Sequence, residues 1–118
     1  MDNNDPLTHY LRELSTIQPL TKDEETDLFR HVRNQDEQAE FAARRLIETR
    51  LSLVVSIAEL HSSTSIHMLD LIQKGNEALL LALDTFHGSS SDSFATHAAT
   101  FVENAVSKAI AELQSASE

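Results

Sequence analysis

The sequence predicts an all-α protein, a compact helical domain of about five helices. Apolar residues recur at helical spacing along most of the 118 residues, and only 2 glycines and 2 prolines interrupt them. Aromatic residues make up 5% of the chain, which is low for the strands of a sheet. A chain of this length encloses one hydrophobic core, so we expect a single domain over residues 1–118.

The first two helices are predicted from the residues that open them. Asp5-Pro6 combines an N-cap side chain with proline at the first helical position. This helix is expected to reach about Thr16, and its apolar stripe is made of Leu7, Tyr10, Leu11 and Leu14. Pro19 breaks the chain, and Thr21-Lys22-Asp23-Glu24 then forms a capping box. The second helix is expected to end near Arg33, with three residues facing the core: Leu28, Phe29 and Val32.

The third helix is expected to be the central one, from about Asp36 to His61. It carries two apolar stripes, and a helix that is apolar over so much of its circumference is covered on several sides. One stripe contains Ile47, Leu51, Val54, Val55 and Ala58, and the other contains Leu46, Leu53, Ile57 and Leu60.

Two further helices complete the predicted domain. After a loop at residues 62–65, a fourth helix is expected from about Ile66 to Phe86, with core positions Leu69, Ile72, Leu79 and Leu83. The serine-rich segment 88–93 is typical of a flexible linker. A fifth helix is expected from about Phe94 to Gln114, and residues 115–118 are expected to fray.

The charge balance disfavours strong binding to nucleic acid. Nine basic against 19 acidic residues give a net charge of −10, and only Lys74 and Lys108 are basic after residue 50. A nucleic-acid-binding protein normally shows a basic stripe, because its affinity rests mainly on phosphate contacts. Arg44 and Arg45 lie at helical spacing from Glu40 and Glu48, so we expect these residues to pair with each other.

No pattern of catalytic or metal-binding residues is present, so we expect neither an enzyme nor a bound cofactor. The six histidines show no i, i+3 or i, i+4 spacing, and cysteine is absent. No apolar run approaches the roughly 20 residues that span a bilayer, so no membrane partner is expected. The polar, acidic N-terminus does not resemble a secretory signal, and a cytoplasmic location is expected.

The most informative segment is Leu69–Leu79. Asp70, Gln73, Asn76 and Glu77 lie at offsets of 0, 3, 6 and 7, which places them on one helix face. The segment resembles the core-binding helix, region 2.2, of the sigma-70 family of bacterial transcription initiation factors. Three more blocks resemble that family in the same order: residues 5–25 region 1.2, 43–58 region 2.1, and 94–110 regions 2.3 and 2.4. The resemblance implies a region 1.2-like part at 1–34, a region 2-like part at 35–114 and a tail at 115–118.

The resemblance also implies a partner. In the family, the region 2.2 helix docks on the clamp coiled coil of the RNA polymerase β′ subunit. Carried over by position, the polymerase-binding residues are Asp70, Gln73, Lys74, Asn76, Glu77 and Leu80. Lys74 stands where the family favours glutamate. The alternative interpretation is that these polar residues form only a solvated helix face.

The positions that would face promoter DNA depart from the family pattern. The family opens the −10 element with aromatic side chains that trap a flipped base and with basic side chains on the strand. Here His97 takes the tyrosine position, Thr100-Phe101 replaces the tryptophan pair, and Glu103 replaces an arginine. His61 ends the segment where the family has Lys-Lys-Tyr. The residues carried over as DNA-binding are Phe94, Thr96, His97, Thr100, Phe101, Asn104 and Lys108.

The sequence therefore leads to one main hypothesis and two alternatives. The main hypothesis is a sigma-70-like regulatory domain that docks on the β′ clamp, with weakened or lost −10 melting. One alternative is a divergent sigma factor fragment that still binds −10 DNA. The other is a protein-interaction module that keeps the fold without binding polymerase. An anti-sigma-type protein is a possible further partner, and exposed Leu80 and Leu81 could instead serve a homodimer.

Overall fold

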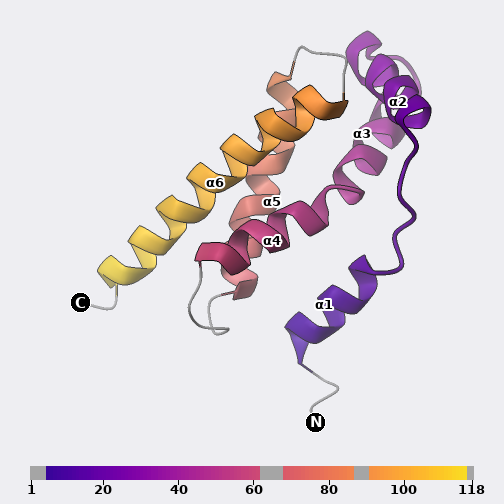
Figure 1. Cartoon of the computed structure of the whole chain (residues 1–118). Coiled ribbons are helices and arrows are strands. Elements are labelled where there is room, and N and C mark those ends of the chain that lie inside the picture. Colours follow the sequence, from indigo (N-terminus) through magenta and orange to yellow (C-terminus); the bar gives the residue numbers. More distant parts are fainter. Residues whose placement is uncertain (1–4, 62–67, 87–90, 117–118) are drawn as a thin grey trace.

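The computed structural model describes residues 5–61, 68–86 and 91–116, and within these ranges it contains helices and short turns but no strand (Figure 1). The all-α prediction is therefore confirmed. The helices are α1 Pro6–Leu14, α2 Lys22–Asn34, α3 Ala39–Glu48, α4 Leu51–His61, α5 Met68–Thr85 and α6 Ser91–Ala116. None of the helices in the described ranges is long and apolar enough to cross a membrane.

The predicted starts of the first two helices are confirmed. The Asp5 carboxylate accepts hydrogen bonds from the backbone N–H of Thr8 at 3.3 Å and from its hydroxyl at 2.7 Å. In the capping box of α2, the Glu24 N–H donates to the Thr21 hydroxyl at 3.1 Å, and the Thr21 N–H donates to the Glu24 carboxylate at 2.9 Å. These bonds satisfy backbone donors that have no partner inside the first turn of a helix.

The predicted third helix is interrupted, which corrects the expectation of one helix from Asp36 to His61. The chain leaves regular α-helix at Thr49 and Arg50, where the Arg50 N–H donates to the Ile47 carbonyl and the Leu53 N–H donates to the Arg50 carbonyl. These tighter turns let the Arg50 side chain reach the Glu25 carboxylate of α2 at 2.6 Å. The division of the segment into α3 and α4 therefore coincides with a contact between residues 25 positions apart.

Two other boundaries also differ. Residues 91–93, expected in a linker, already form the first turn of α6, and residues 115–116, expected in the tail, are still helical. Serine and aspartate are common at helix starts, so a serine-rich stretch does not by itself separate a linker from a first turn. The predicted loop at 62–65, residues 88–90 of the linker, and 117–118 lie outside the described residues.

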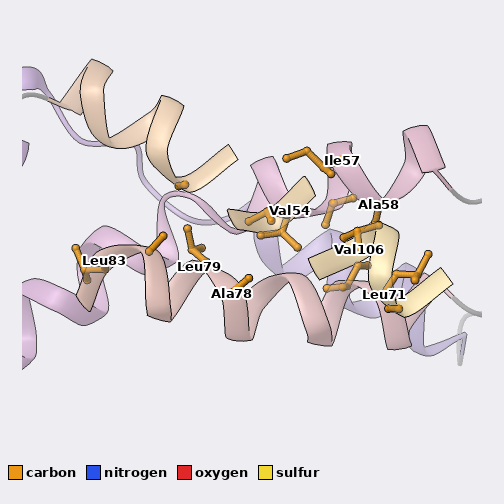
Figure 2. Close-up of a cluster of buried hydrophobic side chains, with 14 of the residues drawn as sticks. Val54, Ile57, Ala58, Leu71, Ala78, Leu79, Leu83 and Val106 are labelled. Carbon is orange, nitrogen blue, oxygen red and sulfur yellow. The ribbon is translucent and has the colours of Figure 1, made fainter. Parts of the chain in front are cut away.

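The core lies where α4, α5 and α6 pack together, and Figure 2 shows side chains from all three helices converging there. Its largest fully buried side chains include Leu71 and Leu79 of α5, together with Val102 and Val106 of α6. Two leucines expected in the core are instead on the surface: Leu69 is 38% exposed and Leu60 is 81% exposed. The buried stripe of α5 runs through Met68, Leu71, Ile72, Gly75, Ala78, Leu79, Ala82 and Leu83.

Gly75 permits the close approach of these helices. A Cβ atom at this position would lie 2.5 Å from the Cγ1 atom of Val54 and 3.3 Å from the Cγ1 atom of Val102. A glycine inside a helix normally lowers stability. Its presence here is explained by the narrow space between α4, α5 and α6, which leaves no room for a Cβ atom.

The N-terminal helices join this core through a few contacts. Phe29 of α2 packs with Phe86 and Phe94, and the three ring centroids are 5.2 to 5.5 Å apart. Helix α1 contains no fully buried residue, although Leu7, Tyr10 and Leu14 pack against the core. In Figure 1, α1 lies apart from α2.

Candidate functional site

The exposed face of α5 brings together most of the predicted polymerase-binding residues. Asp70, Gln73, Lys74 and Glu77 are exposed, and Leu80 is 57% exposed. They lie opposite the buried stripe that holds α5 against α4 and α6. Five of the six residues carried over from the family resemblance therefore share one exposed face of α5.

Asn76 is placed differently from the other five. Its side chain is half-buried, and its Nδ2 atom donates a hydrogen bond of 3.2 Å to the Tyr10 hydroxyl oxygen of α1. Its Oδ1 atom is buried and has no hydrogen-bond partner among the described residues. Asn76 therefore lies at the edge of the α5 face, where it contacts α1. Nothing in the sequence pattern predicts this contact between residues 66 positions apart.

The charged groups on this face are available to a partner. Within the described ranges, none of Asp70, Lys74, Glu77 and Asp84 takes part in a salt bridge. By contrast, Arg44 pairs with Glu40 at 3.3 Å and Arg45 with Glu48 at 3.6 Å, as predicted. The Arg cluster is thus neutralised locally, while the charges on α5 are not.

The predicted DNA-binding residues on α6 differ in how far they are exposed. Thr96, Thr100, Asn104 and Lys108 are exposed. Phe94 is fully buried in the aromatic cluster with Phe29 and Phe86, so in this conformation it presents no surface to a ligand.

His97 and Phe101 are half-buried and pack against each other, with ring centroids 4.8 Å apart. His97 also lies 5.7 Å from the Phe86 ring, and its Nε2 atom is 3.1 Å from the Thr85 hydroxyl. His97 is therefore in contact with α5, and the two aromatic side chains at the family's base-trapping positions pack against each other.

A contact that the sequence did not predict joins α4 to α6. The Nε2 atom of His61 lies 3.0 Å from a carboxylate oxygen of Glu103. Both residues had been recognised as departures from the family pattern, but their separation of 42 positions gave no signal that they meet. Glu103 also borders a shallow, open groove along α6, lined by Ala95, Thr96, Ala99, Thr100, Glu103 and Asn104.

No other chemistry competes with these surfaces in the described part of the chain. There, no group of three or more His, Cys, Asp or Glu side chains is arranged to hold a metal ion. The geometry instead offers two helix faces, one charged and unpaired on α5 and one nearly uncharged on α6.

Comparison with known families decides the assignment. The model of sigma-70 region 2 matches residues 46–115, and the model of sigma-70 factor region 1.2 matches residues 5–42. The chain belongs to the sigma-70 family. The region 2 match covers α4 and α5 completely and α6 up to residue 115, and the region 1.2 match covers α1 and α2.

This sigma-70 family chain is similar to several proteins named RNA polymerase sigma factor SigA. It is 38% identical to that of a Bacillus species over 109 residues, which are 92% of this chain and 28% of the relative. The SigA of Lactococcus lactis subsp. cremoris is 39% identical and that of Clostridium acetobutylicum 36%, again over 92% of this chain and over 30% and 28% of the relatives. The chain therefore spans less than a third of the length of these relatives.

Proposed function

We propose that this chain acts in transcription initiation as a sigma-70-type domain that binds bacterial RNA polymerase core through α5, while opening −10 promoter DNA weakly or not at all. The observation that carries the proposal is the difference between the two exposed helix faces. The family assignment and the relatives' names support the polymerase as the partner.

The exposed face of α5 supports docking on the β′ clamp coiled coil. Asp70, Gln73 and Glu77 project hydrogen-bonding groups that are unpaired in the described structure and rest on a rigid, buried helix. A rigid support lowers the entropic cost of binding, because few groups have to be ordered when the partner arrives. Lys74 departs from the family pattern, because it places a cation on this surface where the family favours glutamate.

The exposed face of α6 supports weak melting. Base stacking on an aromatic side chain is worth roughly 1–3 kcal/mol per base, but it requires an accessible ring face. His97 directs part of its ring surface to Phe86, and His97 and Phe101 pack against each other. Glu103 places a carboxylate beside the exposed groove, and Lys108 is the only lysine or arginine in the α6 sequence.

The proposal is tested by titrating bacterial core RNA polymerase with the wild-type chain and with single variants. Gln73→Ala and Asp70→Asn are expected to weaken binding about tenfold each, since a hydrogen bond to a charged group contributes roughly 1.5–3 kcal/mol. Glu112→Gln, an exposed change on α6, is the matched control. Asn76→Ala is unsuitable, because it would also remove the contact with Tyr10.

Equal affinities for all four proteins would contradict docking through α5. The same set distinguishes the third hypothesis, a protein-interaction module outside transcription. In that case the wild-type chain would show no binding to core polymerase at any attainable concentration.

Binding of −10 DNA is the second candidate function, and the exposed amide of Asn104 favours it, because an amide side chain can hydrogen-bond adenine in the major groove. Titration with a fluorescent non-template −10 oligonucleotide at low salt distinguishes this second candidate from our proposal. Under our proposal the wild-type chain binds weakly or not at all. Glu103→Arg should raise the affinity and make it more salt-dependent, because a cation replaces an anion near the strand. Tight wild-type binding that is lost in Phe101→Ala would establish the second candidate instead.

A further inference from the structure

A pocket lies beside the α5 face and has no role in the function proposed above. It is formed where α2 and α3 meet the C-terminal half of α5, and its volume is about 380 Å³. Figure 1 shows α2 and α3 at this end of the molecule. The apolar part of its lining consists of Phe29, Val32, Ala43, Leu80, Leu83 and Phe86.

The pocket opens onto the exposed face of α5. Leu80, one of its lining residues, is 57% exposed and belongs to the predicted docking set. Leu81 beside it is 58% exposed. A partner lying along α5 would therefore reach the pocket without any rearrangement of the helices.

The charges around the pocket indicate what kind of partner fits. Asp84 at its rim continues a row formed with Asp70 and Glu77, because residues seven apart lie nearly in line on an α-helix. All three carboxylates are exposed, and among the described residues none has a salt bridge. Lys74 on the same face and Arg33 in the pocket lining offset part of this charge, which leaves three carboxylates against two cations. A surface that stays acidic and has exposed leucines beside it is complementary to a helix that carries both cations and large apolar side chains.

We infer that the pocket receives a large apolar side chain, such as leucine, methionine or phenylalanine, from a basic amphipathic helix of RNA polymerase. This inference rests on the proposed function and adds an anchor to it. A buried apolar anchor beside complementary charges is the arrangement that concentrates binding energy at protein interfaces. A second copy of this chain is disfavoured as the occupant, because its net charge of −10 would repel the same acidic row.

The chain offers a clean way to identify the occupant. It contains no cysteine, so Arg33→Cys places a unique thiol at the rim of the pocket for a benzophenone label. Ala111→Cys, exposed on α6 and absent from the pocket lining, is the matched control. After irradiation with core polymerase, the label at residue 33 is expected to capture a polymerase segment in which lysines or arginines alternate with apolar residues at helical spacing.

Affinity measurements with the same polymerase give a second test. Ala43→Met fills part of the pocket, and Asp84→Lys reverses the charge at its rim; each should weaken binding roughly fivefold or more. Arg33→Gln removes a cation that would repel a basic partner, so this substitution should strengthen binding by up to about threefold. Asp84 is exposed, so Asp84→Lys remains informative even if Ala43→Met fails to fold.

The outcomes separate this inference from the proposal on which it rests. If Gln73→Ala weakens binding while Ala43→Met and Asp84→Lys do not, docking through α5 holds and the anchor is wrong. Capture of another copy of this chain would overturn the anchor in favour of self-association. If the wild-type chain does not bind core polymerase at all, both ideas fail together.

Discussion

The N-terminal and C-terminal halves of this molecule differ in how much apolar surface their helices bury. Helices α4, α5 and α6 pack through a continuous apolar core in which α5 approaches its neighbours closely at Gly75. Helices α1, α2 and α3 join that core through the buried side chains of Phe29 and Leu46, through partly buried apolar residues, and through a few polar links. These links are Glu25 with Arg50, Asn76 with Tyr10, and Arg45 with the Gln18 carbonyl.

This difference suits the proposed function. A docking surface is most effective on an element whose position is fixed, and α5 is the helix most enclosed by the core. Helix α1, which reaches the edge of the docking face at Asn76, is held by much less buried surface. We therefore expect substitutions in the two halves to differ in size and in the region of the molecule that they affect.

The largest expected effect is at the ion pair that joins α2 to the start of α4. Glu25 is 7% exposed and lies 2.6 Å from the Arg50 guanidinium, whose Nε atom is also buried and unpaired within the described residues. Glu25→Ala leaves that charge without a partner and should lower the free energy of unfolding by about 3 kcal/mol, measured by urea denaturation.

The control for this prediction is the double variant Glu25→Leu with Arg50→Met. Replacing both charges with apolar side chains of similar size is often neutral or stabilising, so the double variant should be close to wild type. A loss below about 1 kcal/mol in Glu25→Ala would show that the pair does not hold the N-terminal helices in place.

The next effect tests the apolar half. Gly75→Ala should gain up to about 1 kcal/mol from helix propensity but lose more through overpacking against Val54, for a net loss of about 1 kcal/mol. Thermal unfolding measures the net change. Combining the substitution with Val54→Ala should give less destabilisation than the sum of the two single changes, because the smaller side chain removes the clash. A more stable Gly75→Ala variant would mean that α4 and α5 are less closely packed than the structure indicates.

A smaller and more local effect is expected at α1. Tyr10→Phe removes the hydroxyl that accepts the Asn76 hydrogen bond, which is worth about 1 kcal/mol or less. Hydrogen exchange should become faster in α1 while α4 to α6 remain unchanged, since α1 can detach without opening the core. Hydrogen exchange in Leu11→Ala is a useful comparison with that in Tyr10→Phe, because Leu11 lies on the same helix and is 39% exposed. Equal acceleration throughout the molecule would contradict the separation of the two halves.

The sequence predicted features that depend on neighbouring residues. The N-cap at Asp5, the capping box at Thr21 and the pairing of Arg44 with Glu40 follow from spacings of three or four residues, and all are confirmed. The docking face on α5 could be predicted for the same reason, since helical periodicity fixes which side chains share a face. What the face binds remains a prediction.

Features that depend on distant residues could not be predicted in this way. The break at Thr49 and Arg50 accompanies the contact with Glu25, and the edge of the docking face is set by Tyr10, 66 positions from Asn76. Leu60 and Leu69 fit an apolar periodicity, but in the described structure neither is covered by a neighbouring helix, and both are exposed. Local patterns define helices and their faces, whereas the arrangement of neighbouring helices decides which faces are buried.

The smallest expected effect concerns acid, and it belongs to the N-terminal half. The hydrogen bond from the His31 ring lowers the pKa of Asp36 below its ordinary value of 3.8, and the Thr21 backbone and hydroxyl lower the pKa of Glu24 below 4.5. A carboxyl whose pKa is lower in the folded protein stabilises the fold above its ordinary pKa, and this contribution disappears as the pH falls through the lowered value. Asp36→Asn should therefore lower the melting temperature slightly at pH 6 and make no difference to it well below the ordinary pKa. Glu37→Gln changes the neighbouring exposed residue, and its effect on the melting temperature should show no such pH dependence. A difference that persisted unchanged into strong acid would show that Asp36 acts through packing of the α2–α3 turn and not through its charge.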